Sequence, residues 1–211
     1  MSDPGPTPPL SEAVERVLAA DAAIQASNPT PFPVPIGNLA PIVAGAASAL
    51  PRGDAWSPGL RERAGAVLRG LSIDAVARRF SDGFAGSKPY HILPTSPSPA
   101  NRALRAVGWA VANPDRGALV HLGTGSTADG AFHEALNLAA RFSPNILFLV
   151  AVDPLGKGAP FGPQLATRPA QIARAFSIPT TVVDGRDADA VHVAVAAARS
   201  AGGPHLIEAS L

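Results

Sequence analysis

The hydrophobic and polar positions of the chain form their clearest pattern between residues 118 and 153. An apolar run at 118–122 precedes a glycine-rich stretch at 123–130, which reads GTGSTADG. A second apolar run occupies 146–152, and between the two runs four apolar residues recur at helical spacing: Phe132, Ala135, Leu136 and Ala139. The pattern predicts a strand, a loop, a helix and a second strand.

The glycine-rich loop at 123–130 is the candidate ligand site of this unit. Two strands joined by a crossover helix run parallel, and ligands of parallel sheets bind beyond the carboxyl ends of the strands. The loop follows directly on the first of these ends. A lone glycine pattern also occurs in loops that only turn the chain, so both interpretations stay open at this point.

The C-terminal part of the chain continues the alternation of helix and strand. A helix is expected at 172–176, followed by a strand that ends at Asp184 and a helix capped by Asp187. The last strand is expected at 206–208. This alternation predicts an α/β fold with a mostly parallel sheet and helices on both faces.

The N-terminal 35 residues have a different character from the rest. Residues 1–9 contain four prolines and cannot form regular structure, because proline removes donors and fixes its dihedral angle. A short helix is expected from Ser11, and the proline-rich segment 28–35 ends it. We therefore divide the chain into a Pro-rich arm with one short helix, 1–35, and an α/β domain, 36–211. The segment 28–35 is either a linker or an arm laid over a partner subunit.

Composition excludes several classes of function. Hydrophobic residues make up 46% of the chain and charged residues 16%, which is typical of a globular protein. A net charge of +1 gives no general attraction to nucleic acid or to an anionic membrane. The absence of cysteine excludes disulfides, thiolate catalysis and cysteine-ligated metal. No apolar run approaches the roughly twenty residues of a membrane helix, and the expected location is the cytoplasm.

The order of GTGSTADGAFHEALNLAA and ILFLVAVD resembles a known cofactor motif. It is similar to the thiamine-diphosphate motif in the alpha chain of the decarboxylase/dehydrogenase component of 2-oxoacid dehydrogenase complexes, in a compact and partly diverged form. In that family the loop reads Gly-Asp-Gly, and the helix often carries the Phe-His-Glu-Ala-Leu-Asn found here at 132–137. The resemblance implies the diphosphate-binding half of a thiamine-diphosphate-binding fold.

The resemblance also implies a set of ligands for the cofactor and for magnesium. Gly123, Gly125 and Ser126 fall on the cofactor-binding loop. The implied metal ligands are Thr124, Asp153 and the main-chain carbonyl of Leu155. Magnesium prefers oxygen ligands, so Asp153 suits the ion well, whereas Thr124 offers a neutral hydroxyl where the family has a carboxylate. Asp129, in the same loop, either joins these ligands or caps the following helix.

The likeness extends to the segment that follows the arm, where Gly37, Asp54, Arg69 and Gly70 fall on matching positions. By position Arg61 takes the role of the family arginine that grips the diphosphate, a task that suits the planar guanidinium group. The alternative is that Arg61 is an ordinary solvated charge on a helix.

Other parts of the chain depart from the family. Residues 97–102, expected as loop, replace a glycine-rich stretch that holds the pyrimidine ring of the cofactor. His91 and Lys157 lie in loops where each is more simply a surface residue than a catalytic one. A beta chain supplies the activating glutamate in this family, so no catalytic residue is expected here.

Two hypotheses follow. In the first, the chain is an alpha-type subunit that binds thiamine diphosphate and magnesium, and completes the site of a 2-oxoacid dehydrogenase or acyl/ketol-transferring enzyme with a beta-type subunit in an α2β2-like hetero-oligomer. In the second, it is a degenerate, non-catalytic subunit that keeps the fold and partner surface as a structural or regulatory piece. The second is favoured by Thr124, by Leu60 in place of a family tyrosine, and by the segment 97–102. The first is favoured by Gly123, Gly125, Arg61 and Asp153.

Overall fold

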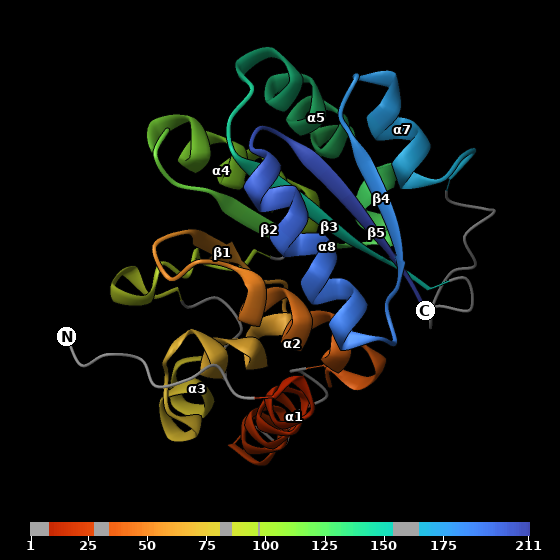
Figure 1. Cartoon of the computed structure of the whole chain (residues 1–211). Helices are drawn as coiled ribbons and strands as arrows, with labels where there is room; N and C mark the ends of the chain where they lie inside the picture. The colour runs from red at the N-terminus through yellow and green to blue at the C-terminus, as the bar shows by residue number, and fades with distance from the viewer. Residues whose placement is uncertain (1–8, 28–33, 81–85, 97, 154–164) are drawn as a thin grey trace.

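A five-stranded, wholly parallel sheet organises the molecule (Figure 1). The computed structural model describes residues 9–27, 34–80, 86–96, 98–153 and 165–211. The strands lie in the order β1-β2-β3-β5-β4, so the last strand in sequence lies between two earlier ones. The strands are β1 (Ala55–Ser57), β2 (Ala118–Gly123), β3 (Ile146–Val152), β4 (Thr180–Asp184) and β5 (His205–Ser210). The short edge strand β1 has no counterpart in the sequence prediction.

The predicted strand-loop-helix-strand unit is confirmed. Strands β2 and β3 pair in parallel and are joined by helix α5 (Gly130–Phe142), with Ala118 opposite Ile146 at the start of the pair. The apolar residues that predicted the helix all face the core and are fully buried: Phe132, Ala135, Leu136 and Ala139. The rings of Phe132 and of Phe148 on β3 pack in a T-shaped contact, which fixes α5 against the sheet.

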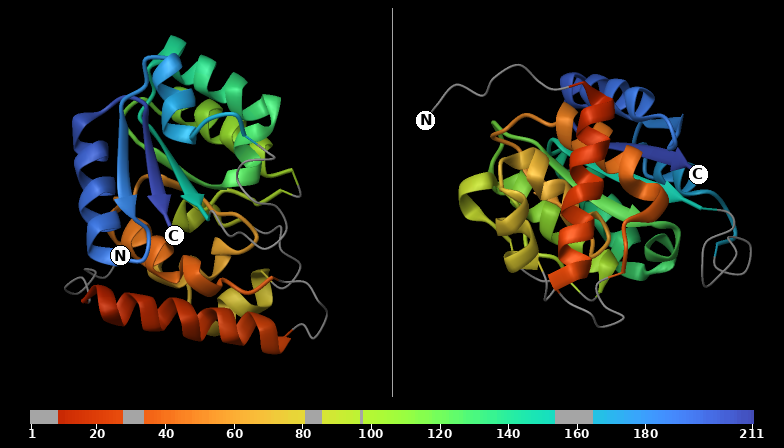
Figure 2. Two further views of the ribbon diagram at one scale, coloured as in Figure 1. Left: turned by 90° about the vertical axis from the view of Figure 1, so that its right-hand side faces the viewer. Right: turned by 90° about the horizontal axis from the view of Figure 1, so that it is seen from below.

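Helices cover both faces of the sheet, as the alternation predicted (Figure 2). Helices α4 (Pro99–Ala112), α5 and α7 (Pro169–Ala175) pack on one face. Helices α2 (Ala40–Ala49) and α8 (Ala188–Ala201) pack on the other, with α1 (Leu10–Ser27) and α3 (Ile73–Phe80) further out. Alternate residues of β2 and β3 enter the two cores, so both strands are apolar except for the buried His121 of β2, a pattern typical of a buried parallel strand.

Helix α1 connects the N-terminal segment to the domain. It is 18 residues long, and its buried residues Val17 and Ile24 belong to the same core as α2 and α8. Buried Asp21 of α1 accepts a hydrogen bond from the amide of Ile36 at 3.2 Å. This bond ties the helix to the start of the predicted α/β domain. The predicted boundary at residue 35 therefore separates two segments of sequence that share one hydrophobic core.

Four short 3₁₀ helices complete the described part of the chain, and one of them is held by a buried arginine. They are η1 (Gly37–Leu39), η2 (Glu62–Arg69), η3 (Lys88–Tyr90) and η4 (Thr124–Ala128). Arg69, at the end of η2, donates hydrogen bonds to the carbonyls of Leu50, Pro51, Arg52 and Asp54 at 2.8–3.1 Å. The side chain of Asp54 in turn accepts from the Gly117 amide at 2.8 Å and pairs with Arg199. Arg69 therefore fixes the segment 50–54 to the end of η2, and Asp54 fixes the same segment to Gly117 and to Arg199 of α8.

A second buried charge fixes helix α7 to the sheet. The side chain of Glu208 on β5 is fully buried. It accepts hydrogen bonds from Arg168 Nε at 2.6 Å and from the Ala170 amide at 3.0 Å. Because a buried carboxylate is costly unless it is paired, this contact fixes the start of α7 against the end of β5.

The prediction of loop at 97–102 is wrong for most of that segment. Helix α4 begins at Pro99, within the segment that was expected to be loop. The first turn of the helix therefore includes Arg102. Proline favours the first position of a helix because it has no N–H to lose there and its dihedral angle is already helical. Pro99, which the sequence analysis assigns to a loop, marks the start of the helix.

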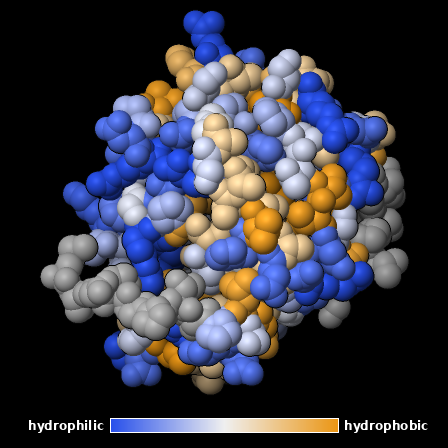
Figure 3. All heavy atoms as spheres, in the orientation of Figure 1, coloured by the Kyte–Doolittle hydropathy of each residue, from blue (hydrophilic) through white to orange (hydrophobic). Residues whose placement is uncertain are grey.

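An apolar strip runs across the middle of one face of the molecule, in the region of α8 (Figure 3). Val193 of α8 is 66% exposed, and Val182 of the edge strand β4 is 53% exposed.

Within the described residues, no helix is both long enough and apolar enough to span a membrane.

Candidate functional site

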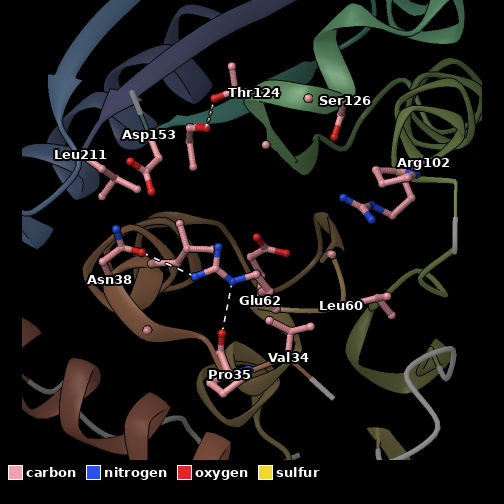
Figure 4. Close-up of a pocket in the computed structure, with 18 of the residues that line it drawn as sticks. Val34, Pro35, Asn38, Leu60, Glu62, Arg102, Thr124, Ser126, Asp153 and Leu211 are labelled. Atoms are coloured by element: carbon pink, nitrogen blue, oxygen red, sulfur yellow. Dashed lines mark hydrogen bonds between the residues drawn. The ribbon is translucent and has the colours of Figure 1, made fainter. Parts of the chain in front are cut away.

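A cleft of about 890 Å³ lies at the carboxyl ends of β2 and β3 (Figure 4). One side, which we call the strand-end wall, consists of residues 123–126 with Ala151 and Asp153. The opposite side, which we call the arginine wall, consists of residues 34–35, 37–39 and 59–62. Ser96, Pro99 and Arg102 line the cleft at the start of α4. The cleft therefore lies where a parallel sheet is expected to bind its ligand.

The strand-end wall contains five of the residues predicted to bind the cofactor or the metal: Gly123, Thr124, Gly125, Ser126 and Asp153. They meet because β2 and β3 end side by side, with Gly123 opposite Ala151. Leu155, the remaining predicted metal ligand, lies outside the described residues, as does Lys157. Residues that are 27 positions or more apart in sequence thus share one surface.

The hydroxyl of Thr124 already has a partner within the strand-end wall. Its Oγ1 donates to the carbonyl of Ala151 at 3.2 Å, and the Thr124 carbonyl accepts from Thr127 Oγ1 at 2.7 Å. The first bond ties the start of η4 to the end of β3, and the second lies within η4. The lone pairs of Thr124 Oγ1 remain available to a cation, but the side chain brings no negative charge.

Asp129 is the cap of helix α5. Its carboxylate accepts a hydrogen bond from the amide of Ala131 at 2.9 Å, and it does not line the cleft. Of the two interpretations of Asp129, the capping role is confirmed.

Arg61 lines the arginine wall, but its guanidinium group also binds main chain. Its Nε donates to the Pro35 carbonyl at 3.1 Å and its Nη2 to the Ile36 carbonyl at 3.0 Å. Gly37 follows directly on Ile36, and its φ of +54° is a left-handed conformation that favours glycine. Arg61 is therefore more than a solvated helix charge, since it joins the segment at 35–36 to the cleft.

Two charged residues of the cleft, Glu62 and Arg102, were not predicted as site residues. Their side chains are 9% and 4% exposed. A Cβ on Gly59 would collide with Glu62 Oε2 and lie 2.9 Å from Arg102 Nη2, so the two charged groups lie close to one another. Burial lowers the pKa of Arg102, and the neighbouring carboxylate of Glu62 opposes that shift. A sequence signal was present, because Pro99 at a helix start places Arg102 in the first turn.

The histidine considered from the sequence, His91, does not line the cleft. His91 is partly exposed and takes a left-handed conformation with φ of 52°. Burial is the main cause that lowers its pKa, and it does not line the cleft. His121, which the sequence did not single out, is fully buried on β2, and burial lowers its pKa to about 3. Its main-chain carbonyl accepts a hydrogen bond from Arg102 Nη2 at 2.8 Å.

The described residues fit an oxyanion better than they fit a magnesium ion. Arg61, Arg102 and the glycine-rich turn offer donors and positive charge. Thr124 and Asp153 are the two predicted metal ligands that the structure describes, and only Asp153 carries a charge. Across the described part of the chain, no group of three or more histidine or acidic side chains is arranged to hold a metal.

Comparison with known proteins decides the family. The model of the family described as the dehydrogenase E1 component matches residues 13–211, which is nearly the whole chain. This chain belongs to the dehydrogenase E1 component family. The match includes most of helix α1, in agreement with the packing of that helix into the domain core.

Curated relatives in the E1 family carry alpha-subunit names. The chain is 32% identical over 177 residues to the 3-methyl-2-oxobutanoate dehydrogenase subunit alpha of Mycobacterium tuberculosis, covering 78% of this chain and 48% of that protein. It is 35% identical over 173 residues to the pyruvate dehydrogenase E1 component subunit alpha of Staphylococcus aureus, covering 76% and 46%. The chain therefore spans about half the length of these relatives.

Solved structures support the fold. Transketolase from Campylobacter jejuni superimposes with a TM-score of 0.77 at 17% identity, covering 95% of this chain and 37% of that one. At this level of identity the likeness concerns the fold alone. The α/β fold expected from the sequence, and its likeness to the alpha chain of the E1 component, are both confirmed.

Proposed function

We propose that this chain is an alpha-type subunit of a thiamine-diphosphate-dependent 2-oxoacid dehydrogenase or acyl/ketol-transferring enzyme. The observation that carries the proposal is the convergence of six predicted residues on one cleft. Arg61 lies on one wall, and Gly123, Thr124, Gly125, Ser126 and Asp153 lie on the other. The family assignment and the alpha-subunit names of the relatives support the same reading.

In this proposal both walls bind the diphosphate, and the strand-end wall also holds the metal. The donors of the turn at 123–126 and the guanidinium of Arg61 bind the diphosphate, because both present N–H groups to an anion. Asp153 holds magnesium, together with Thr124 Oγ1 and the carbonyl of Leu155. Thiamine diphosphate, when bound, supplies the carbanion chemistry of decarboxylation. The chain's own residues bind and orient it, and no catalytic residue is assigned among them.

A beta-type subunit completes the site in this proposal and contributes the acidic group that activates the cofactor. We place the two chains in an α2β2-like hetero-oligomer in the cytoplasm. Exposed apolar side chains such as Val182 and Val193 suit a subunit that is covered by a partner. The proposed division of the chain is a Pro-rich N-terminal segment with one helix, 1–35, and a cofactor domain, 36–211.

Two observations favour a second candidate, a non-catalytic subunit that keeps only the fold and the partner surface. Thr124 brings no negative charge to the metal side of the cleft. Arg61 uses two of its donors on the carbonyls of Pro35 and Ile36, which leaves fewer for a diphosphate. The two candidates differ in whether a magnesium-dependent cofactor binds.

Thermal melting of the chain together with a beta-type subunit tests the proposal. Thiamine diphosphate should raise the melting temperature only when magnesium is present, because a ligand stabilises the native state that binds it. At ligand concentrations about 100 times Kd the gain is about 2.7 kcal/mol. Asp153→Ala should abolish the shift, whereas Asp115→Ala should keep it, because exposed Asp115 precedes β2 at the opposite end of the strand.

Thr124→Asp separates the two candidate functions. If the parent protein shows no magnesium-dependent shift and Thr124→Asp creates one, the chain is the non-catalytic subunit with a relic of the site. If the parent shows the shift, the enzyme-subunit proposal stands. No shift in either protein contradicts the assignment of the metal to the strand-end wall.

A further inference from the structure

Arg102 occupies an unusual position for a charged side chain. It is 4% exposed, yet it lines the cleft at the start of helix α4. One of its terminal nitrogens, Nη2, donates to the His121 carbonyl at 2.8 Å. Its Nε is buried and has no hydrogen-bond partner among the residues that the structure describes. A buried donor without a partner is costly, so this nitrogen favours a ligand that accepts from it.

The N-terminus of α4 opens at the same place. The helix is 14 residues long, and the residue that precedes it, Ser98, makes no capping hydrogen bond with its side chain. Pro99 has no N–H, so the uncapped donors at this end are the amides of Ala100 and Asn101. Ser96 and Pro99 line the cleft, which places this helix end at its rim. The partial positive charge of a helix N-terminus adds to that of Arg102.

Two further charged groups act on Arg102. The carboxylate of Glu62 stabilises its positive charge, and Arg105, one turn later on α4, opposes it. The Glu62 carboxylate therefore competes with any external anion for the same guanidinium group. Figure 4 shows Arg102 and Asp153 on opposite sides of the cleft, with Glu62 between them. The positive charge at α4 is thus separate from the place proposed for magnesium.

The geometry points to a second anion subsite in this cleft, formed by Arg102 and the uncapped start of α4, which binds an oxyanion group of a small ligand. The group is a carboxylate or a phosphate, because both accept from the planar guanidinium and from main-chain N–H groups. Ser126, on the strand-end wall, also lines the cleft and has a hydroxyl to offer. The inference rests on the proposed function in so far as it takes this cleft to be a ligand site.

The test uses the full chain without cofactor and with EDTA, so it is independent of magnesium. Inorganic phosphate and, separately, acetate are titrated at constant ionic strength, and the apparent Kd is taken from the rise in melting temperature. Tighter binding of phosphate assigns the subsite to a phosphate group, and tighter binding of acetate assigns it to a carboxylate. If neither anion stabilises the chain, the inference is overturned.

Three variants locate the binding. Arg102→Gln should weaken the preferred anion by about tenfold or more, the usual effect of removing a charge-assisted hydrogen bond. Glu62→Gln should strengthen it, because the competing carboxylate is lost. Arg105→Gln is the control and should change the affinity little, since Arg105 donates to the Thr95 carbonyl and does not line the cleft.

The outcomes keep the subsite and the proposed function apart. If Arg102→Gln is too unstable to titrate, Glu62→Gln carries the test, and unchanged affinity in that variant overturns the subsite. If Arg61→Gln abolishes anion binding and Arg102→Gln does not, the anion lies on the arginine wall, and the subsite is wrong. Failure of thiamine diphosphate to bind while phosphate or acetate binding depends on Arg102 contradicts the proposed function and leaves the subsite standing.

Discussion

The two walls of the cleft are built in different ways. The strand-end wall follows directly from the sheet: its residues are the last of β2 and β3, and the parallel register brings Gly123 opposite Ala151. The arginine wall contains little regular structure, and the contacts that hold it are made by long side chains to main-chain carbonyls. The positions of the first wall are fixed by the core, whereas those of the second depend on individual arginines. A substitution in the arginine wall should therefore change stability and binding together.

The largest effect is expected at Arg69, at the far end of the 3₁₀ helix η2 that begins at Glu62 of the arginine wall. Its guanidinium is 2% exposed and donates to four carbonyls, those of Leu50, Pro51, Arg52 and Asp54. Arg69→Gln should lower the free energy of unfolding by about 4 kcal/mol, because it leaves buried acceptors without partners. Urea unfolding followed by circular dichroism measures this change.

Arg61→Gln is the matched control for that substitution. Arg61 is partly exposed and donates to the carbonyls of Pro35 and Ile36, so its loss should cost about 1 kcal/mol. Equal losses of stability in the two variants would contradict the division between a supporting arginine and a cleft arginine.

The next effect is a dependence of folding stability on pH. It involves His121 on β2, the strand that leads to the strand-end wall. Burial lowers the pKa of His121 to about 3, well below the ordinary value of 6.5. Between these two values the unfolded chain binds a proton that the folded chain does not, so His121 makes the fold less stable as the pH falls below 6.5. From pH 6.5 to pH 4.5 the loss should be about 2–3 kcal/mol.

His121→Phe tests this assignment, because phenylalanine keeps a ring against Trp56 and cannot be protonated. The free energy of unfolding, measured by urea titration across the same pH range, should fall less steeply in the variant. His133→Gln changes a partly exposed histidine on α5 and should leave the slope as it is in the parent. An unchanged slope in His121→Phe means that other groups cause the acid sensitivity.

The smallest effect is expected at Asp129, next to the strand-end wall. Asp129→Ala removes the cap of α5 and should cost about 1 kcal/mol, whereas Asp129→Asn keeps an acceptor for the Ala131 amide and should cost less. Neither change should alter cofactor or anion binding, because Asp129 does not line the cleft. A loss of binding in both variants would contradict this and would assign Asp129 to the binding site.

The sequence predicted the strand-end wall better than the other parts of the cleft, for a physical reason. The strand, turn and helix at 118–142 are contiguous, and their periodicity defines both the elements and the direction of the loop. The position of Asp153 followed from the end of the next apolar run. Arg61 was predicted from the resemblance alone, and its bonds to Pro35 and Ile36 had no sequence signal.

Glu62 and Arg102 show why the rest of the cleft could not be predicted from the sequence. The two residues are 40 positions apart in sequence, and they meet only because residues 59–62 and the start of α4 are brought together across the end of the sheet. No local pattern encodes that proximity. The start of α4 was encoded by Pro99, but a proline among several others is a weak signal, since most of them mark loops.

The strand order has a consequence for how the chain acquires its structure. Strand β5 pairs with β3 on one side and β4 on the other, so β4 has no neighbour in the sheet until β5 has been made. On a ribosome, residues 118–152 can pair β2 with β3 early, but β4 must wait about twenty residues more for its partner. Strand β5 must also join β3, where the paired residues Leu147 and His205 are 58 positions apart, and because such non-local pairing is slow, closure of the sheet around β5 should be the late step of folding. The half of the sheet that carries the glycine-rich turn is thus the half that forms first.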